Sequence, residues 1–157
     1  MLLLATVHSF SYKLLFLLHI VAIVVAFAPG FVNLSINGRL RGEGSSLAQH
    51  PRVAAIMARN TQLIHGPALA LAGLFGIGMI FSSDKAYKFS QAWVSIAFVL
   101  WIALLGVVFA ALNPAEKQVG NGDEAALKRV NMFGGIVHLL FLLMVIDMIW
   151  KFGAPGS

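Results

Sequence analysis

Four long apolar stretches, at residues 14–31, 63–81, 93–112 and 130–149, constrain the fold of this chain more than any other sequence feature. Asp147 is the one Asp, Glu, Lys or Arg within them. A helix rises about 1.5 Å per residue, so roughly 20 such residues cross a hydrocarbon core of about 30 Å. The sequence therefore predicts an all-α polytopic membrane protein, with four transmembrane helices in an up-down bundle that forms one domain over residues 1–157.

The composition agrees with this class. Hydrophobic residues make up 59% of the 157 residues and charged residues 11%, whereas about 25% of an average soluble domain is charged. The chain has no cysteine, which excludes disulfides, thiolate metal sites and cysteine nucleophiles. Residues 1–10 are apolar and are interpreted as a retained extension of the first helix, because the apolar run beyond Lys13 is too long for a cleaved signal peptide.

The basic residues divide unevenly between the two ends of the predicted bundle. The first and third loops share one side of the membrane, which holds Arg39, Arg41, Arg52, Arg59, Lys117, Lys128 and Arg129. The opposite side holds Lys13, Lys85, Lys88 and Lys151. By the positive-inside rule, both termini are predicted to be extracytoplasmic. The net charge of +5 is read as this orientation signal, and no nucleic-acid partner is expected.

Helix-breaking residues predict where the helices end or bend. The predicted breaks are an irregular loop over residues 33–49, a kink at Pro67 and a helix end at Asn113 and Pro114. Asp123 and Glu124 fit the first turn of the fourth helix, because the free amides there favour carboxylates.

Side-chain size predicts how the helices pack. Ala68, Ala72 and Gly76 recur at every fourth position, which lets helix backbones approach closely in lipid. The second helix is therefore predicted to be central. The third helix has bulky residues all around it and is predicted to face lipid or a partner; these residues are Phe98, Leu100, Trp101, Leu104, Leu105, Val108 and Phe109.

Four ionisable side chains fall within the predicted spans, where an ionisable group is costly unless it has a hydrogen-bonding partner or a functional role. His19 and Asp147 have similar predicted depths and are expected to form a hydrogen-bonded pair. His65 and His138 are the best-matched candidates for two haem ligands, with His19 as a further one, although their depths differ by roughly 5 to 7 Å. Structural histidines with satisfied hydrogen bonds are the favoured interpretation, so no cofactor is expected; haem ligation and a proton relay stay open.

Known catalytic motifs are missing from the sequence: there is no nucleophile elbow, P-loop, dinucleotide fingerprint or metal-ligand spacing. The chain is therefore predicted not to be an enzyme. The basic first loop and the start of the second helix are predicted to contact anionic lipid headgroups such as cardiolipin, through Arg39, Arg41, Arg52 and Arg59.

Three segments carry a resemblance to a known family. They are YKLLFLLHIVAIVVAFAPGF, LIHGPALALAGLFGIGMIF and AWVSIAFVLWIALLGVVFAALNP, within residues 12–114. The chain resembles the actinobacterial respiratory supercomplex association factors, within a family of uncharacterised bacterial four-helix membrane proteins. The resemblance implies a bacterial plasma-membrane protein that accompanies cytochrome bcc and aa3-type cytochrome c oxidase, without catalytic residues. The early histidine is also similar to one in membrane protoporphyrinogen oxidases and copper-resistance membrane proteins.

Three functions follow as hypotheses. The first is a non-catalytic accessory subunit of a respiratory electron-transfer supercomplex. The second is a haem-binding or porphyrin-oxidising membrane enzyme that uses His19, His65 and His138. The third is a small dimeric transporter, suggested by Gly and Pro in the second helix and by Asp147 in the fourth.

Overall fold

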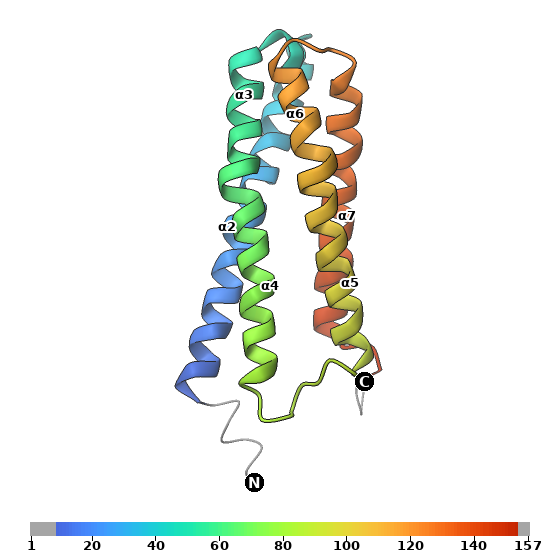
Figure 1. Ribbon diagram of the computed structural model, residues 1–157. Coiled ribbons are helices and arrows are strands. Elements are labelled where there is room, and N and C mark those ends of the chain that lie inside the picture. Colours follow the sequence, from blue (N-terminus) through green and yellow to red (C-terminus); the bar gives the residue numbers. More distant parts are fainter. Residues whose placement is uncertain (1–8, 154–157) are drawn as a thin grey trace.

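The computed structural model describes residues 9–153 and is 83% helical, with no strand in that range. Four helical segments are long and apolar enough to cross a membrane: Phe10–Gly42, Pro51–Phe81, Ala92–Gly120 and Ala126–Trp150. They alternate in direction, and the start of the first and the end of the last lie at the same end of the bundle (Figure 1). The predicted four-helix all-α fold is confirmed.

The first and fourth segments are each a single α-helix, α2 (Phe10–Gly42) and α7 (Ala126–Trp150). The second and third segments are each interrupted by a π-helical turn. The second runs through α3 (Pro51–Asn60), the π-helical turn η2 (Thr61–His65) and α4 (Gly66–Phe81). The third runs through α5 (Ala92–Val107), the π-helical turn η3 (Val108–Leu112) and α6 (Asn113–Gly120). A short 3₁₀ helix, η1 (Leu47–Gln49), precedes α3.

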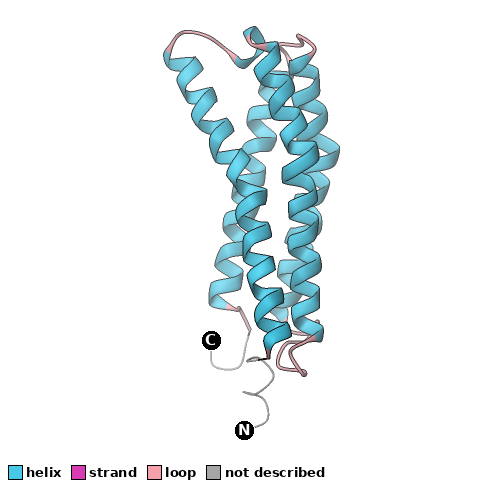
Figure 2. Ribbon diagram, turned by 90° about the vertical axis from the view of Figure 1, so that its left-hand side faces the viewer, coloured by secondary structure: helices cyan, strands magenta, loops and turns pink. Residues whose placement is uncertain are grey.

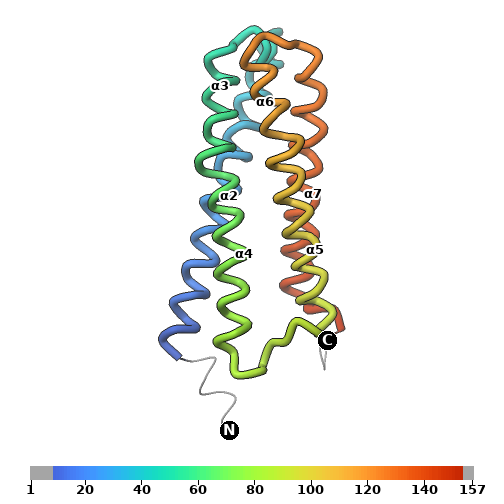
Figure 3. Tube along the Cα trace, viewed as in Figure 1, coloured from blue at the N-terminus to red at the C-terminus, as the bar shows by residue number. Residues whose placement is uncertain are grey.

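The helices associate in pairs. The α2 helix packs closely on α4, α5 packs on α7, and α3 packs on α6. In Figures 1 and 3 the α2/α4 pair and the α5/α7 pair stand apart in the half that holds the start of α2 and the end of α7, and the helices lie closer together near α3 and α6. Ala68 and Ala72 are buried as predicted. The second span contacts both of its neighbours, because α4 packs mainly on α2 and α3 packs on α6.

The first helix extends further than predicted in both directions. It begins at Phe10, where the Ser9 hydroxyl accepts a hydrogen bond from the Tyr12 amide at 3.2 Å; the rest of the predicted extension, residues 1–8, lies outside the described residues. It also passes through Pro29 and continues to Gly42. The irregular loop predicted from residue 33 therefore starts only after residue 42. A continuous helix satisfies its own backbone groups, which lipid cannot do. The last turns of α2 lean away from the other helices (Figure 2).

The helix end predicted at Pro114 is also wrong, since the segment continues to Gly120. Pro114 follows the π turn η3 by two residues, and Pro67 follows the π turn η2 at the same spacing. A proline ring collides with the carbonyl four residues earlier, and a π turn is a wider turn that makes room for it. The two prolines are thus absorbed by local widening of the helix.

The third helix is not confined to the outside of the bundle, which corrects the prediction from its bulky residues. Leu104 and Val108 are fully buried in the core. The Trp101 indole N–H donates to the Leu69 carbonyl at 2.9 Å, and its ring lies over Gly73. A Cβ atom at Gly73 would lie 2.0 Å from that ring. Gly73 therefore admits a tryptophan between α4 and α5.

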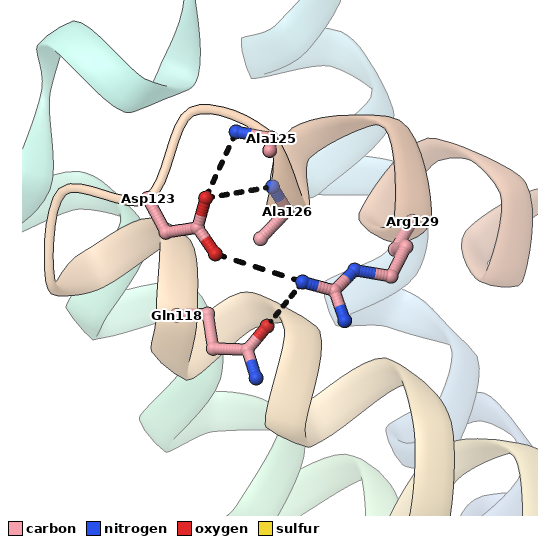
Figure 4. A network of polar contacts seen from close by, with 5 residues as sticks. All are labelled: Gln118, Asp123, Ala125, Ala126 and Arg129. Atoms are coloured by element: carbon pink, nitrogen blue, oxygen red, sulfur yellow. Dashed lines mark hydrogen bonds and ion pairs between the residues drawn. The ribbon is translucent and has the colours of Figure 1, made fainter.

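The turn between α6 and α7 is held by polar contacts at the basic end (Figure 4). Asp123 Oδ1 accepts from the Ala125 and Ala126 amides at 3.0 and 3.3 Å. The Arg129 guanidinium donates to Gln118 Oε1 at 2.7 Å and lies 3.6 Å from the Asp123 carboxylate. Asp123 and Glu124 precede α7 instead of occupying its first turn, and Asp123 still pairs with the free amides there.

Candidate functional site

A small polar cavity lies at the level of the two π turns and has a volume of about 70 Å³. We call it the polar cavity. The α2 helix, both π-containing segments and α7 contribute to its wall. It is lined by Gly30, Asn33, Leu34, Asn37, Met57, Thr61, His65, Leu112, Glu116, Val130, Asn131, Gly134, Gly135, Val137 and His138.

The π turns position the polar residues of this cavity. Thr61 is the first residue of η2 and His65 is the last, and both are buried. Asn113 directly follows η3 and donates from Nδ2 to the Ala58 carbonyl at 2.8 Å. Glu116 follows one helical turn later, beside Thr61. Sequence reasoning missed Glu116, because it placed the end of the third helix before this residue.

Three buried polar atoms here lack a hydrogen-bond partner within residues 9–153: His65 Nε2, His138 Nε2 and Glu116 Oε2. His65 and Glu116 are each only 3% exposed. The Nδ1 atom of His138 donates to the Gly134 carbonyl at 2.7 Å, so its Nε2 is an acceptor in the neutral ring. Since a water molecule takes up about 30 Å³, the cavity has room for about two of them. The sequence predicted that the histidines would have satisfied hydrogen bonds. For His138 this is true of Nδ1, whereas Nε2 has no partner within residues 9–153.

Aromatic rings lie beside His65, one of the residues that line the polar cavity. The Phe27 ring lies 5.7 Å from the His65 ring and stacks on Phe141 at 3.8 Å between centroids. Three amide side chains also belong to the wall of the polar cavity: Asn33, Asn37 and Asn131.

The structure brings together two of the three histidines that were candidates for haem ligands. His65 and His138 line the polar cavity in spite of their predicted difference in depth, whereas His19 lies in a different cavity. Pockets for small-molecule ligands and cofactors measure about 300 to 1,000 Å³. A cavity of about 70 Å³ between His65 and His138 does not accommodate a porphyrin.

The larger cavity, which we call the apolar cavity, has a volume of about 420 Å³. It lies between the α2/α4 pair and the α5/α7 pair, where Figures 1 and 3 show these pairs apart. Eight aromatic side chains contribute to its wall: Tyr12, Phe16, Phe27, Tyr87, Trp93, Phe98, Trp101 and Phe141. Its size falls within the range of ligand pockets.

Among residues 9–153, His19 is the one histidine in the wall of the apolar cavity. Its Nδ1 atom donates to the Ala72 carbonyl at 2.6 Å. The ring reaches this carbonyl over Gly76, where a Cβ atom would lie 3.3 Å from Cε1 of the ring. The His19 ring therefore packs against the face of α4 that carries the small residues Ala72 and Gly76.

The predicted hydrogen bond between His19 and Asp147 is absent. His19 is held by Ala72, and both carboxylate oxygens of Asp147 lack a partner within the described residues. Asp147 is 2% exposed. The similarity in predicted depth could not show that a carbonyl oxygen of α4 lies within hydrogen-bond distance of His19.

Aromatic and basic groups gather at the mouth of the apolar cavity. The Lys151 ammonium lies 5.3 Å from the Tyr87 ring centroid and 5.7 Å from the Trp93 ring centroid. Lys151 ends α7 in a left-handed conformation, with φ of 48°. Tyrosine, tryptophan and lysine at the end of a span are typical of the membrane interface.

The four arginines predicted to contact lipid headgroups lie at the basic end. Arg39 and Arg41 lie in the last turn of α2, and Arg52 and Arg59 lie on α3. All four are exposed, and Arg39 has an ion-pair distance of 4.0 Å to Glu43. Within residues 9–153, no group of three or more His, Asp or Glu side chains is arranged to hold a metal ion.

Comparison with known proteins gives no match to a family model, to a curated protein or to a solved structure.

Proposed function

We propose that this chain is a non-catalytic accessory subunit of a respiratory electron-transfer supercomplex, with cytochrome bcc and aa3-type cytochrome c oxidase subunits as its partners. The resemblance of residues 12–114 to the supercomplex association factors supports the choice of partner. The observation that carries the proposal is the outer face of α5, which has the composition of a helix-packing surface.

This outer face comprises Val99, Ile102 and Gly106 of α5 and continues to Ala110 of η3, and all four residues are exposed. Gly106 and Ala110 are four residues apart, and nothing lies within 4 Å of a Cβ atom built at Gly106. Glycine within a helix costs about 1 kcal/mol relative to alanine. In lipid, small residues four apart let the backbone of another helix approach closely. Close packing of a neighbouring span against Gly106 would explain why glycine stands here, because no contact within the described bundle requires it.

The proposal includes an orientation in the bacterial plasma membrane. The end that holds Arg39, Arg41, Arg52 and Arg59 faces the cytoplasm, so that both termini are extracytoplasmic. There the arginines contact anionic headgroups such as cardiolipin, each contributing about 1 kcal/mol.

The experiment is an affinity purification from native membranes in a mild detergent, with Gly106→Leu compared with wild type. We expect wild type to retain cytochrome bcc and oxidase subunits and Gly106→Leu to lose most of them. Gly38→Leu is the matched control, because Gly38 is also exposed with nothing within 4 Å of a built Cβ atom. Equal recovery of these subunits with Gly106→Leu, or no respiratory subunit with wild type, would contradict the proposal.

Haem binding is a second candidate, favoured by the Nε2 atoms of His65 and His138, which line one cavity and have no hydrogen-bond partner in the described part of the chain. The volume of the polar cavity counts against it. The optical spectrum of the purified chain alone decides between the two: a Soret band that is lost in His65→Ala and His138→Ala supports haem binding, and a colourless folded protein removes it.

A further inference from the structure

The apolar cavity combines a hydrophobic wall with one hydrogen-bond acceptor. The Ala72 carbonyl can only accept, so the neutral His19 ring carries its proton on Nδ1 and leaves Nε2 as an acceptor. Within residues 9–153, His19 Nε2 has no hydrogen-bond partner. An acceptor on an apolar wall favours a ligand that brings an O–H or N–H donor, because an unpaired polar group there costs free energy.

The wall chemistry indicates the body of the ligand. Phe16, Phe27, Trp93 and Trp101 offer ring faces and edges, which pack well against flat rings. No ionised side chain belongs to this wall except Lys151 at the mouth, where its ammonium lies over two aromatic rings. A charged headgroup at the level of His19 would meet no counter-ion in the wall, so a neutral ligand is favoured there.

From the acceptor, the ring-lined wall and the volume of about 420 Å³, we propose that the apolar cavity binds a lipid-soluble ring compound that carries a hydroxyl group, of the quinol class, with this hydroxyl donating to His19 Nε2. The proposal concerns the isolated chain and does not depend on a respiratory partner.

The test uses a matched pair of probes, decylubiquinol and decylubiquinone. The reduced ring carries two hydroxyl groups and the oxidised ring carries none, while size and hydrophobicity stay similar. Binding is measured by quenching of tryptophan fluorescence in lipid nanodiscs, in a Trp150→Phe background. This change removes the tryptophan outside the wall and keeps Trp93 and Trp101, which line the cavity.

We expect quinol to bind up to about tenfold more tightly than quinone, the contribution of one hydrogen bond. His19→Phe removes this preference by losing the acceptor and keeping an aromatic ring. His19→Gln retains it, because its amide N–H₂ can donate to Ala72 and its carbonyl oxygen can accept. Ala97→Phe, which fills the cavity from α5, abolishes quenching by both probes.

Equal affinity for the two probes, or a quinol preference that persists in His19→Phe, overturns the proposal. Quenching that Ala97→Phe leaves unchanged shows partition into the lipid and also overturns it. The same holds if phospholipid remains bound in the purified chain and neither probe displaces it. If Ala97→Phe does not fold, the comparison of His19→Phe with His19→Gln decides.

Discussion

The two halves of the bundle differ in how closely their helices pack and in the side chains between them. Near the basic end, α3, α6 and α7 pack around the polar cavity, to which the π turn η2 contributes Thr61 and His65 and the π turn η3 contributes Leu112. In the other half, two helix pairs stand apart around the apolar cavity, which aromatic side chains line. One half is narrow and polar, and the other is wide and apolar.

This difference shows what holds each half together. In lipid the hydrophobic effect does not drive helices together, so close packing and hydrogen bonds between helices must do so. The polar half has such a bond from Asn113 to Ala58, between α6 and α3. The apolar half relies on ring packing and on the bonds from His19 and Trp101 to α4.

The largest expected effect comes from removing a buried ring that lines the apolar cavity and lies beside His65. Phe27→Ala deletes a buried ring that stacks on Phe141, and large-to-small core changes of this kind cost about 3 to 5 kcal/mol. We expect a lower midpoint of thermal unfolding in detergent. Phe81→Ala is the control, because this side chain is 75% exposed and should leave the midpoint nearly unchanged. Equal loss in both variants would mean that Phe27 is not a boundary of the core.

A smaller effect is expected where Trp101 enters between α4 and α5. A Cβ atom at Gly73 would overlap the Trp101 ring, so Gly73→Ala forces the indole to move and costs about 1 to 3 kcal/mol. Gly106→Ala has open space and should stabilise the helix by up to about 1 kcal/mol. The measurement is the free energy of unfolding of both variants in the same micelles. A destabilisation of equal size at both positions would argue against the Trp101 contact.

The smallest expected change in stability comes from replacing Asp147, a buried carboxylate in the apolar half. Asp147 is buried and has no hydrogen-bond partner among residues 9–153, so Asp147→Leu should stabilise the bundle by about 1 kcal/mol through removal of an unsatisfied group. The exposed Asp84 serves as the control, with Asp84→Leu expected to have little effect. Destabilisation by Asp147→Leu in a thermal unfolding series would show that this carboxylate has a partner which the bundle alone does not reveal.

The sequence was sufficient to predict the four spans, because long apolar stretches without charge have few alternatives to a membrane helix. It was not sufficient for the polar cavity. The π turns at Thr61–His65 and Val108–Leu112 have no known signature in one sequence, and Pro114 was read as a helix end although η3 accommodates it. Glu116 was thereby placed in a loop. The burial of Leu104 and Val108 was missed because apolar residues surround the third helix on all sides.

The most direct test of the proposed function is photo-crosslinking in the native membrane. A photoreactive amino acid at position 106 probes the outer face of α5, and the same residue at position 38 serves as the comparison, since both sites are exposed and open. We predict that position 106 crosslinks to a cytochrome bcc or oxidase subunit and that position 38 does not. Crosslinks from position 106 to lipid alone, or to a second copy of this chain, would contradict an accessory subunit that packs through α5.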